Sequence, residues 1–293
     1  MKIEKLLKRY RIEHGKHFRL SNHNPGDTHG LNSENKPMAK NLVTEGVKEL
    51  TRLQDILAAQ DRWGLLLIFQ AMDAAGKDST IKHVMSGVNP QGVDVWSFKT
   101  PSTEELHHGY LWRTTKCMPA RGTIGIFNRS YYEEVLVVRV HPKILESQKL
   151  PPSLVTKHIW QERFEDINNQ ERYATRNGIA VLKFFLHLSK KEQKLRFLER
   201  LDDPRKNWKF SSSDVKEREF WDDYQQAYED MIRYTASPYA PWYVVPADNK
   251  WFTRLVVSHA VVDALKKMDL KYPTVSRAEK AALAEARKKL EKE

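Results

Sequence analysis

Hydrophobic and polar positions along the chain follow two periods, one typical of helices and one typical of buried strands. From Leu42 to Leu57, apolar residues recur at helical spacing and predict an amphipathic helix. Short apolar runs predict five strands, at residues 64–69, 93–98, 123–127, 179–188 and 242–247. Helical stretches at 80–88 and 103–117 lie between strands, and another, 253–265, follows the last one. This alternation predicts an α/β fold with a parallel five-stranded sheet sandwiched by helices.

The segments on either side of this core differ from it in composition. Residues 1–38 are polar and contain His, Asn, Gly and Pro, so we expect an irregular basic arm. Residues 271–293 are expected to form a C-terminal helix, because Ser276 and Glu279 fit a capping box. No stretch rich in Gly, Ser or Pro divides the chain between them. We therefore expect one domain over residues 39–270.

The apolar runs and the cysteine content indicate the expected cellular location of the protein. The runs are shorter than the roughly 20 residues that cross a bilayer, and the basic N-terminal segment lacks the apolar block of a signal peptide. We therefore expect no membrane partner. The single cysteine, Cys117, leaves neither an internal disulfide nor a Cys-rich metal site. A cytoplasmic location is expected.

The charge balance is strongly basic. Lys and Arg number 49 against 38 Asp and Glu, which gives a formal charge of +11. Such an excess favours polyanionic partners, among which are nucleic acid, anionic lipid, nucleotides and polyphosphate. A well-solvated basic surface without a specific partner would have the same composition.

The stretch AMDAAGKDST, residues 71–80, follows the first predicted strand and resembles a phosphate-binding loop. The usual pattern is G-x-x-x-x-G-K-[ST], whose backbone N–H groups and helix N-terminus attract phosphate oxygens. Here Ala71 replaces the first glycine, whereas Gly76 and Lys77 are in place. Besides Lys77, the residues expected to bind phosphate or nucleotide are Ala74, Ala75, Gly76, Asp78, Ser79 and Thr80. An ordinary turn with a surface lysine would also fit.

Asp73 places a carboxylate inside this loop. Phosphate oxygens would repel it by several kcal/mol at low effective dielectric, unless a cation lies between them. Mg²⁺ prefers oxygen ligands and commonly binds one or two carboxylates together with substrate phosphates. We therefore interpret Asp73 as a metal ligand or as a residue that orients metal-bound water. The alternative is a solvated loop aspartate.

A second motif, FNRSYYEEVLVVRVHP (residues 127–142), begins where the third predicted strand ends. In nucleotide kinases this position commonly carries an acid that helps to hold the metal, and here it is Asn128. Asn128 can ligate a metal or form hydrogen bonds without adding charge. The next residue, Arg129, can pair with phosphate through two hydrogen bonds. The alternative is a buried structural arginine paired with Glu133 or Glu134.

A third region, residues 184–224, is rich in Lys and Arg and follows the fourth predicted strand. Phosphoryl transfer needs a mobile basic segment that closes over the phosphates and excludes water. Many of these charges must be solvated helix faces, and we single out Arg196 as a catalytic candidate. Four further basic residues near strand ends are candidates for a phosphate channel or an acceptor site, or are surface charges: Lys99, Arg113, Lys116 and Arg121.

Together, these regions resemble the polyphosphate kinase 2 family. The similarity lies in GLLLIFQAMDAAGKDST, in IGIFNRSYYEEVLVVRVHP and in FFLHLSKKEQKLRFLERLDDPRKNWKFS, and it spans roughly residues 30–270. It implies a P-loop kinase fold akin to thymidylate kinase, with a helical lid at about 190–220. It also implies transfer of a phosphoryl group between inorganic polyphosphate and nucleotides, with Mg²⁺ or alternatively Mn²⁺.

The resemblance also implies roles for single residues. It places Asp73 and Lys77 in the family's Walker A loop, Arg129 in its Walker B segment and Arg196 at its lid arginine. Asn128 departs from the aspartate of many members and resembles the class III subgroup, which acts on nucleoside mono- and diphosphates. AMP as well as ADP is then an acceptor. The same departure puts in doubt a second metal bound at this position.

The expected reaction is in-line transfer of the terminal phosphoryl group of polyphosphate to ADP or AMP, making ATP or ADP. A phosphate acceptor is already largely ionised and needs no general base, so cations have the main task. Because the family often forms homo-oligomers, we expect one here. Two alternatives stay open: an ATP-dependent nucleotide or nucleoside kinase of the same fold, and a basic nucleic-acid-binding protein. We expect no nucleic-acid partner, because the sequence lacks helix-turn-helix, RRM and zinc-knuckle signatures.

Overall fold

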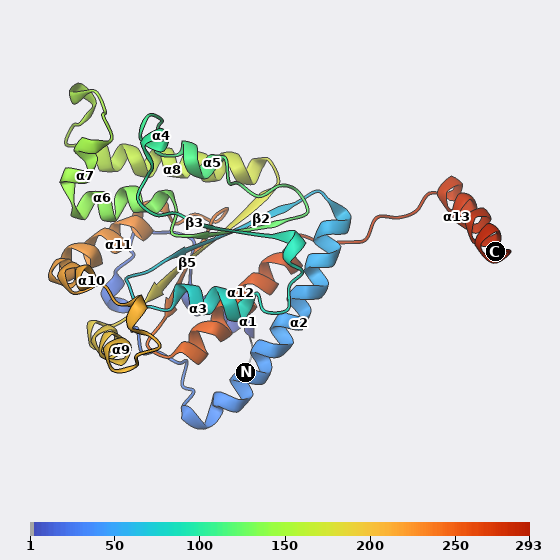
Figure 1. Cartoon of the computed structure of the whole chain (residues 1–293), viewed down its shortest axis with the longest axis horizontal. Helices are drawn as coiled ribbons and strands as arrows, with labels where there is room; N and C mark the ends of the chain where they lie inside the picture. The colour runs from blue at the N-terminus through green and yellow to red at the C-terminus, as the bar shows by residue number, and fades with distance from the viewer. Residues whose placement is uncertain (1–2) are drawn as a thin grey trace.

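The computed structural model describes residues 3–293. Within this part of the chain, six strands form one sheet in the order β1-β6-β5-β2-β4-β3 (Figure 1). The strands are β1 (Arg11–Ile12), β2 (Gly64–Gln70), β3 (Val93–Ser97), β4 (Ile124–Asn128), β5 (Ile179–His187) and β6 (Trp242–Pro246). Strands β2 to β6 are the five predicted ones and pair in parallel, whereas β1 is an additional strand, antiparallel to β6.

The additional strand lies in the N-terminal arm, which the sequence predicted to be irregular. That prediction is wrong for residues 3–12, which form α1 (Ile3–Tyr10) and then β1. α1 buries Leu6, Leu7 and Tyr10 in the core, and β1 pairs with the outer edge of β6, which would otherwise expose unpaired backbone groups. A two-residue strand is too short to show a period in the sequence. The rest of the arm contains two 3₁₀ turns, η1 (Leu20–Asn22) and η2 (Ser33–Asn35).

Helices cover both faces of the sheet (Figure 1). One layer contains α1, α2 (Lys36–Gln60), α3 (Lys77–Val84) and α12 (Lys250–Lys267), and the other contains α8 (Ile159–Arg176) and α11 (Trp221–Thr235). Strand β2 serves both layers. Leu65, Leu67 and Phe69 pack into the first, and Leu66 and Ile68 pack into the second. Because both faces are buried, this strand reads as an unbroken apolar run instead of an alternating one.

The remaining helical elements are short or lie outside these two layers. They are α4 (Thr103–Leu106), α5 (Trp112–Thr115), α6 (Val137–Val140), α7 (Pro142–Ser147), α9 (Lys190–Asp202), α10 (Ser212–Glu217), α13 (Arg277–Leu290), and the 3₁₀ turns η3 (Pro90–Gly92), η4 (Tyr131–Val135), η5 (Pro152–Leu154), η6 (Asn207–Lys209) and η7 (Arg218–Phe220). No helix within residues 3–293 combines the length and the apolarity needed to cross a bilayer.

Three helices differ from the prediction in their ends or their surroundings. The helix predicted at 103–117 is two short helices, α4 and α5, with Gly109 between them. The helix after the loop begins at Lys77 rather than at Thr80, directly after Gly76 in the left-handed region (φ 98°). α13 begins at the predicted capping box, in which the Glu279 N–H donates to Ser276 Oγ at 3.2 Å. It stands away from the rest of the protein on an extended segment (Figure 1).

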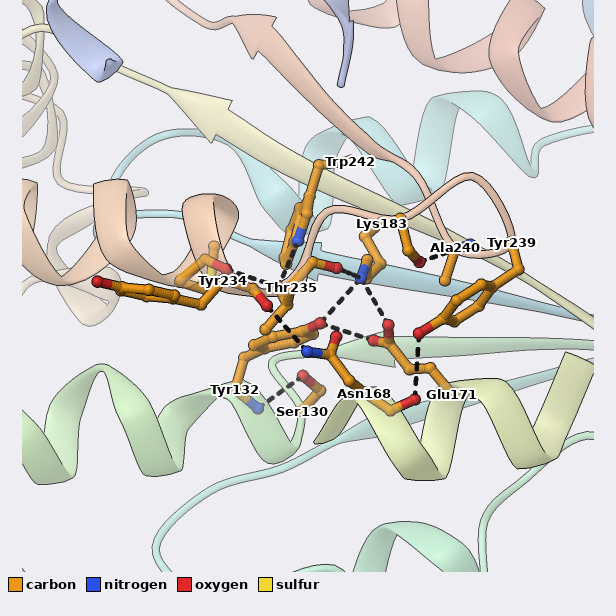
Figure 2. Close-up of polar contacts among 12 residues, drawn as sticks. Ser130, Tyr132, Asn168, Glu171, Lys183, Tyr234, Thr235, Tyr239, Ala240 and Trp242 are labelled. Atoms are coloured by element: carbon orange, nitrogen blue, oxygen red, sulfur yellow. Dashed lines mark hydrogen bonds and ion pairs between the residues drawn. The ribbon is translucent and has the colours of Figure 1, made fainter. Parts of the chain in front are cut away.

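A buried polar network crosses the second helical layer. Figure 2 shows Lys183, from the middle of β5, pointing at Glu171 on α8. Both side chains are fully buried, and Lys183 Nζ donates to Glu171 Oε2 at 2.6 Å, to the Tyr132 hydroxyl at 3.0 Å and to the Thr235 carbonyl at 2.8 Å. Glu171 Oε1 accepts from the hydroxyls of Tyr131 (3.0 Å) and Tyr132 (2.6 Å). The network thereby fixes η4, the turn that follows the end of β4.

Removing the lysine from this network should strongly destabilise the protein. In Lys183→Met the carboxylate of Glu171 stays buried without its partner cation, which we expect to lower the free energy of unfolding by about 3–5 kcal/mol. The double variant Lys183→Met/Glu171→Gln should be more stable than the single one, because it removes the buried charge while the introduced amide oxygen can still accept from the two hydroxyls. Urea unfolding followed by circular dichroism measures both. A loss below about 1 kcal/mol in the single variant would contradict this role.

Candidate active site

A cavity lies at the carboxyl ends of the parallel strands, where ligands bind in sheets of this kind. Its volume is about 780 Å³. The loop after β2 forms one wall, the end of β3 forms another, and β4 contributes its last residue and the one that follows. The lining residues are Asp73, Ala74, Ala75, Gly76, Lys77, Asp78, Ser79, Ile81, Lys82, Val95, Ser97, Phe98, Lys99, Asn128, Arg129 and Arg200.

The loop has the backbone that a phosphate cradle needs. Ala74 (φ 63°) and Gly76 (φ 98°) both lie in the left-handed region, and Gly76 immediately precedes the first turn of α3. Successive N–H groups in such a turn, together with a helix N-terminus, form a concave surface that attracts anions. The first backbone hydrogen bond of α3 runs from Thr80 N to Gly76 O, so the N–H groups of the preceding turn are not used inside the helix.

Lys77 is held within the loop. Its Nζ donates to the Ala71 carbonyl at 3.0 Å, so the ammonium group folds back over the loop that precedes it. Burial lowers the pKa of Lys77, and the negative charge of Asp73 opposes this shift. A substrate phosphate in the cavity would add a further negative charge and favour the protonated form.

Asp73 in the loop and Arg129 after β4 form an ion pair at the cavity wall. Arg129 Nη2 lies 3.4 Å from Asp73 Oδ1, and its Nη1 lies 3.8 Å from Glu133 Oε2. Arg129 therefore lines the cavity and is also near Glu133, but at 41% exposure of its side chain it is not the buried structural arginine of the alternative interpretation. Its pairing with phosphate stays a prediction. The negative charge of Glu133 raises the pKa of Arg129, which burial opposes. Arg129 has a positive φ (64°), a strained conformation for a non-glycine residue of the kind that clusters at functional sites.

Asn128 is joined to the first turn of α3. Its Nδ2 donates to Asp78 Oδ1 at 2.6 Å, across 50 positions of sequence. This bond directs the amide nitrogen toward a carboxylate. It also explains in physical terms why a neutral amide suits position 128, since a carboxylate there would face Asp78 at the same distance and be repelled.

Other predicted site residues lie outside the cavity or only support it. Arg113 is 8% exposed, donates to the Lys99 carbonyl at 2.8 Å and stacks on the ring of Phe98 at 5.5 Å, so it supports two lining residues from behind. Thr80 is buried in α3 and does not line the cavity. Lys116 stacks on Trp112. It and Arg121 are also absent from the cavity wall.

Arg196 lies behind the loop rather than in front of it. Only 4% of the residue is exposed, and its guanidinium donates to the carbonyls of Ala74 and Ala75, both at 3.0 Å. The arginine of α9 that lines the cavity is Arg200, whose Nη1 lies 3.6 Å from Asp214 Oδ2. The sequence could not separate these two residues, because both follow the same strand on the same basic helix.

The sequence analysis treated Glu133 only as a partner of Arg129, but its carboxylate also interacts electrostatically with Lys77 and Asp73. Its side chain is 15% exposed, and burial raises its pKa, with the positive charge of Arg129 opposing the shift. Arg254 was also missed, and its Nη2 donates to Ser79 Oγ at 3.0 Å. The spacing of four residues between Arg129 and Glu133 is a sequence signal that could have identified Glu133. No local sequence pattern indicates that Arg254 contacts the loop.

Comparison with known proteins agrees with this geometry. The family model described as Polyphosphate kinase 2 (PPK2) matches residues 33–273. The chain belongs to the polyphosphate kinase 2 family. An ADP-polyphosphate phosphotransferase of Rhodopseudomonas palustris is 50% identical over 258 residues, which cover 88% of this chain and 89% of that protein. An AMP/ADP-polyphosphate phosphotransferase of Meiothermus ruber is 43% identical over 267 residues, covering 91% and 96%.

Solved structures of the polyphosphate kinase 2 family confirm the P-loop kinase fold. The crystal structure of polyphosphate kinase 2 from Arthrobacter aurescens TC1 matches with a TM-score of 0.85 and 38% sequence identity, covering 95% of this chain and 96% of that one. Membership of a kinase family also implies a requirement for a divalent metal.

The contact between Asn128 and Asp78 makes a testable prediction. In Asn128→Asp an oxygen replaces the bonded nitrogen, so two carboxylates would face each other, and the pair would need a cation or a proton between them. We expect a changed divalent-metal concentration for half-maximal activity and a changed ratio of AMP to ADP phosphorylation. Asn128→Ala is the control, since it removes the bond without adding charge. Metal dependence and acceptor ratio equal to those of the unmodified protein would show that position 128 sets neither.

Proposed function

We propose that this protein transfers the terminal phosphoryl group of inorganic polyphosphate to ADP and AMP, making ATP and ADP, in a reaction that is reversible in principle. The observation that supports this most directly is the cavity itself. The phosphate loop with Lys77, the guanidinium of Arg129 and the carboxylate of Asp73 all line it, at the carboxyl ends of the strands. The chain also belongs to the polyphosphate kinase 2 family. Such a set of groups is suited to binding two phosphate chains at once.

Mg²⁺ is the cation that best fits the donor set. Asp73 is partly exposed (37% of its side chain) and lines the cavity together with Asp78, and both offer carboxylate oxygens. Within residues 3–293 no cluster of three or more His, Cys, Asp or Glu is placed to hold a metal by itself. Mg²⁺ does not need one, because it keeps several waters and completes its shell with substrate phosphates. Asp73 would hold the ion, with Asn128 Oδ1 as a further oxygen donor, and the ion would neutralise charge between the two substrates.

The side chains have tasks that follow from electrostatics. Donor and acceptor are both polyanions, so the barrier is largely the cost of bringing them together in line. The loop N–H groups and Lys77 bind the phosphate next to the bond that breaks. Arg129, oriented by Glu133, can form two hydrogen bonds with the transferred or accepting phosphate. The acceptor oxygen is already ionised, so the reaction proceeds without a general base.

The acceptor is proposed to bind beside β3. Phe98 and Lys99 line this part of the cavity, with Arg113 buried behind them. Asn128 is neutral and donates a hydrogen bond to Asp78. Because an asparagine at this position resembles the class III members, we propose that AMP is an acceptor in addition to ADP. The named relative from Meiothermus ruber, an AMP/ADP-polyphosphate phosphotransferase, is consistent with both acceptors. A homo-oligomer and a cytoplasmic location stay predictions.

A donor comparison tests the proposal. The protein is incubated with Mg²⁺ and ADP or AMP, with polyphosphate, with ATP as donor to AMP, or with no donor, and the nucleotides are separated by chromatography. ATP should form from ADP when polyphosphate is added, well above the donor-free background. Efficient transfer from ATP to a nucleotide, with polyphosphate inert, would favour an ATP-dependent nucleotide kinase instead.

Lys77→Ala should lower turnover with polyphosphate by a factor of roughly 10² or more, since the loop loses its only lysine beside the transferred phosphate. Circular dichroism and the unfolding temperature check that the fold is kept. Lys143→Ala is the matched control, because Lys143 is an exposed lysine on α7, outside the cavity. Nearly full activity of Lys77→Ala would refute the assignment of the loop.

A further inference from the structure

Two buried side chains of α9 reach behind the phosphate loop. Gln193 is 1% exposed, and its Nε2 donates to the Asp73 carbonyl at 2.9 Å. Arg196, one helical turn later, donates to the carbonyls of Ala74 and Ala75. One helix therefore bonds the carbonyls of three consecutive loop residues.

Arg196 uses its whole guanidinium group for this purpose. A guanidinium has five N–H donors, and Arg196 makes five hydrogen bonds. Nη1 donates to Ala74 and Ala75, Nη2 donates to the carbonyls of Ala247 at 2.6 Å and Asp248 at 3.0 Å, and Nε donates to Glu192 Oε1 at 2.9 Å. No N–H is left for a substrate phosphate. The residue instead joins the phosphate loop to the segment that follows β6.

Fixing these carbonyls also fixes the N–H groups that bind phosphate. A trans peptide is planar, so its C=O and the following N–H point in opposite directions. The carbonyls of Asp73 and Ala75 point at α9, and the N–H groups of Ala74 and Gly76 therefore point away from it; both residues line the cavity. The positive φ of Ala74 is part of this arrangement, and such a strained residue persists only where its surroundings hold it.

We propose that Gln193 and Arg196 are positioning residues, which hold the loop in its phosphate-binding conformation before substrate arrives. The proposal rests on the proposed function, since it assumes that the loop binds polyphosphate. It also changes the expected lid. α9, the first part of the expected lid, is then a fixed wall of the site, which leaves closure over the phosphates to the part of the expected lid after Asp202. Arg196 acts through the backbone of the loop, in contrast to the direct phosphate contact that the sequence suggested.

Two substitutions separate positioning from direct contact. Gln193→Leu keeps size and charge but loses the bond to the Asp73 carbonyl. It also loses the bond that Gln193 Oε1 accepts from Arg218 Nη1 at 2.6 Å. Arg196→Lys keeps the charge, but an ammonium has three donors and cannot bond four carbonyls and a carboxylate. We expect both to weaken binding of inorganic tripolyphosphate, measured by isothermal titration calorimetry, by a factor of about 10 or more. Lys194→Ala, an exposed cation on the same helix, is the matched control and should bind like the unmodified protein.

The dependence of binding on salt gives a second readout, one that a direct contact would change. Each lost ionic contact with a polyanion lowers the slope of log affinity against log salt by roughly 0.7, by analogy with single-stranded nucleic acid. For Gln193→Leu and Arg196→Gln we expect weaker binding with an unchanged slope. Unchanged affinity in Gln193→Leu, or a slope lowered by about 0.7 in Arg196→Gln, would overturn the proposal.

The outcomes also separate this proposal from the proposed function. If the unmodified protein does not bind tripolyphosphate at all, the assignment of the loop as a polyphosphate site fails first. If it binds and all variants bind equally well, only the positioning role fails. Unfolding temperatures identify any variant that does not fold. Gln193→Leu is the variant expected to keep the native structure, because leucine is of similar size and Arg218 Nη1, which loses Gln193 Oε1, still donates to the Lys190 carbonyl at 3.2 Å. Turnover of Arg196→Lys equal to that of the unmodified protein would likewise overturn the proposal, because it would show that the charge alone is sufficient at this position.

Discussion

The parallel pairing of β2 with a neighbour on each side is the constraint on which the site depends. Phe69 stands opposite Asn128 of β4 and opposite Phe184 of β5, so β2 and β4 end within one residue of each other, and β5 continues two residues beyond the end of β2. The segments that follow them must therefore meet. The phosphate loop follows β2, Arg129 approaches it from the β4 side, and α9 approaches it from the β5 side. A shift of one residue in either pairing would turn these side chains to the opposite face of the sheet.

Charged side chains of the site and those that support it from the interior have different tasks. Toward the cavity, Asp73, Lys77 and Arg129 are near one another and partly accessible, so they can exchange partners when phosphates and a cation enter. Away from it, Arg196 and the pair of Lys183 with Glu171 are buried and saturated with hydrogen bonds. Buried ionic groups are costly to leave unpaired, so these buried side chains are held firmly in place. A stiff support suits a site that has to hold two mutually repelling molecules in line.

Local patterns in the sequence were sufficient for much of this architecture. The five parallel strands, the loop and the position of Arg129 at the cavity could be predicted, because apolar runs and motifs are contained in short stretches of sequence. β1 could not, because it has two residues. The roles of Arg196 and Arg200 depend on which side of α9 faces the loop. The contact between Asn128 and Asp78 joins residues 50 positions apart. Lys183 interrupts an apolar strand, and its partner Glu171 carries no signal of the pairing.

The separate position of α13 has a practical consequence. Residues 271–276, which connect it to the rest, are exposed along their whole length, and α13 buries none of its residues. A protease that cuts this connection would release the helix and leave the sheet, both helical layers and the cavity whole. Affinity tags, fluorophores or surface attachment can therefore be placed at this end of the chain without disturbing the phosphate loop, and trimming it gives a more compact particle for crystallisation.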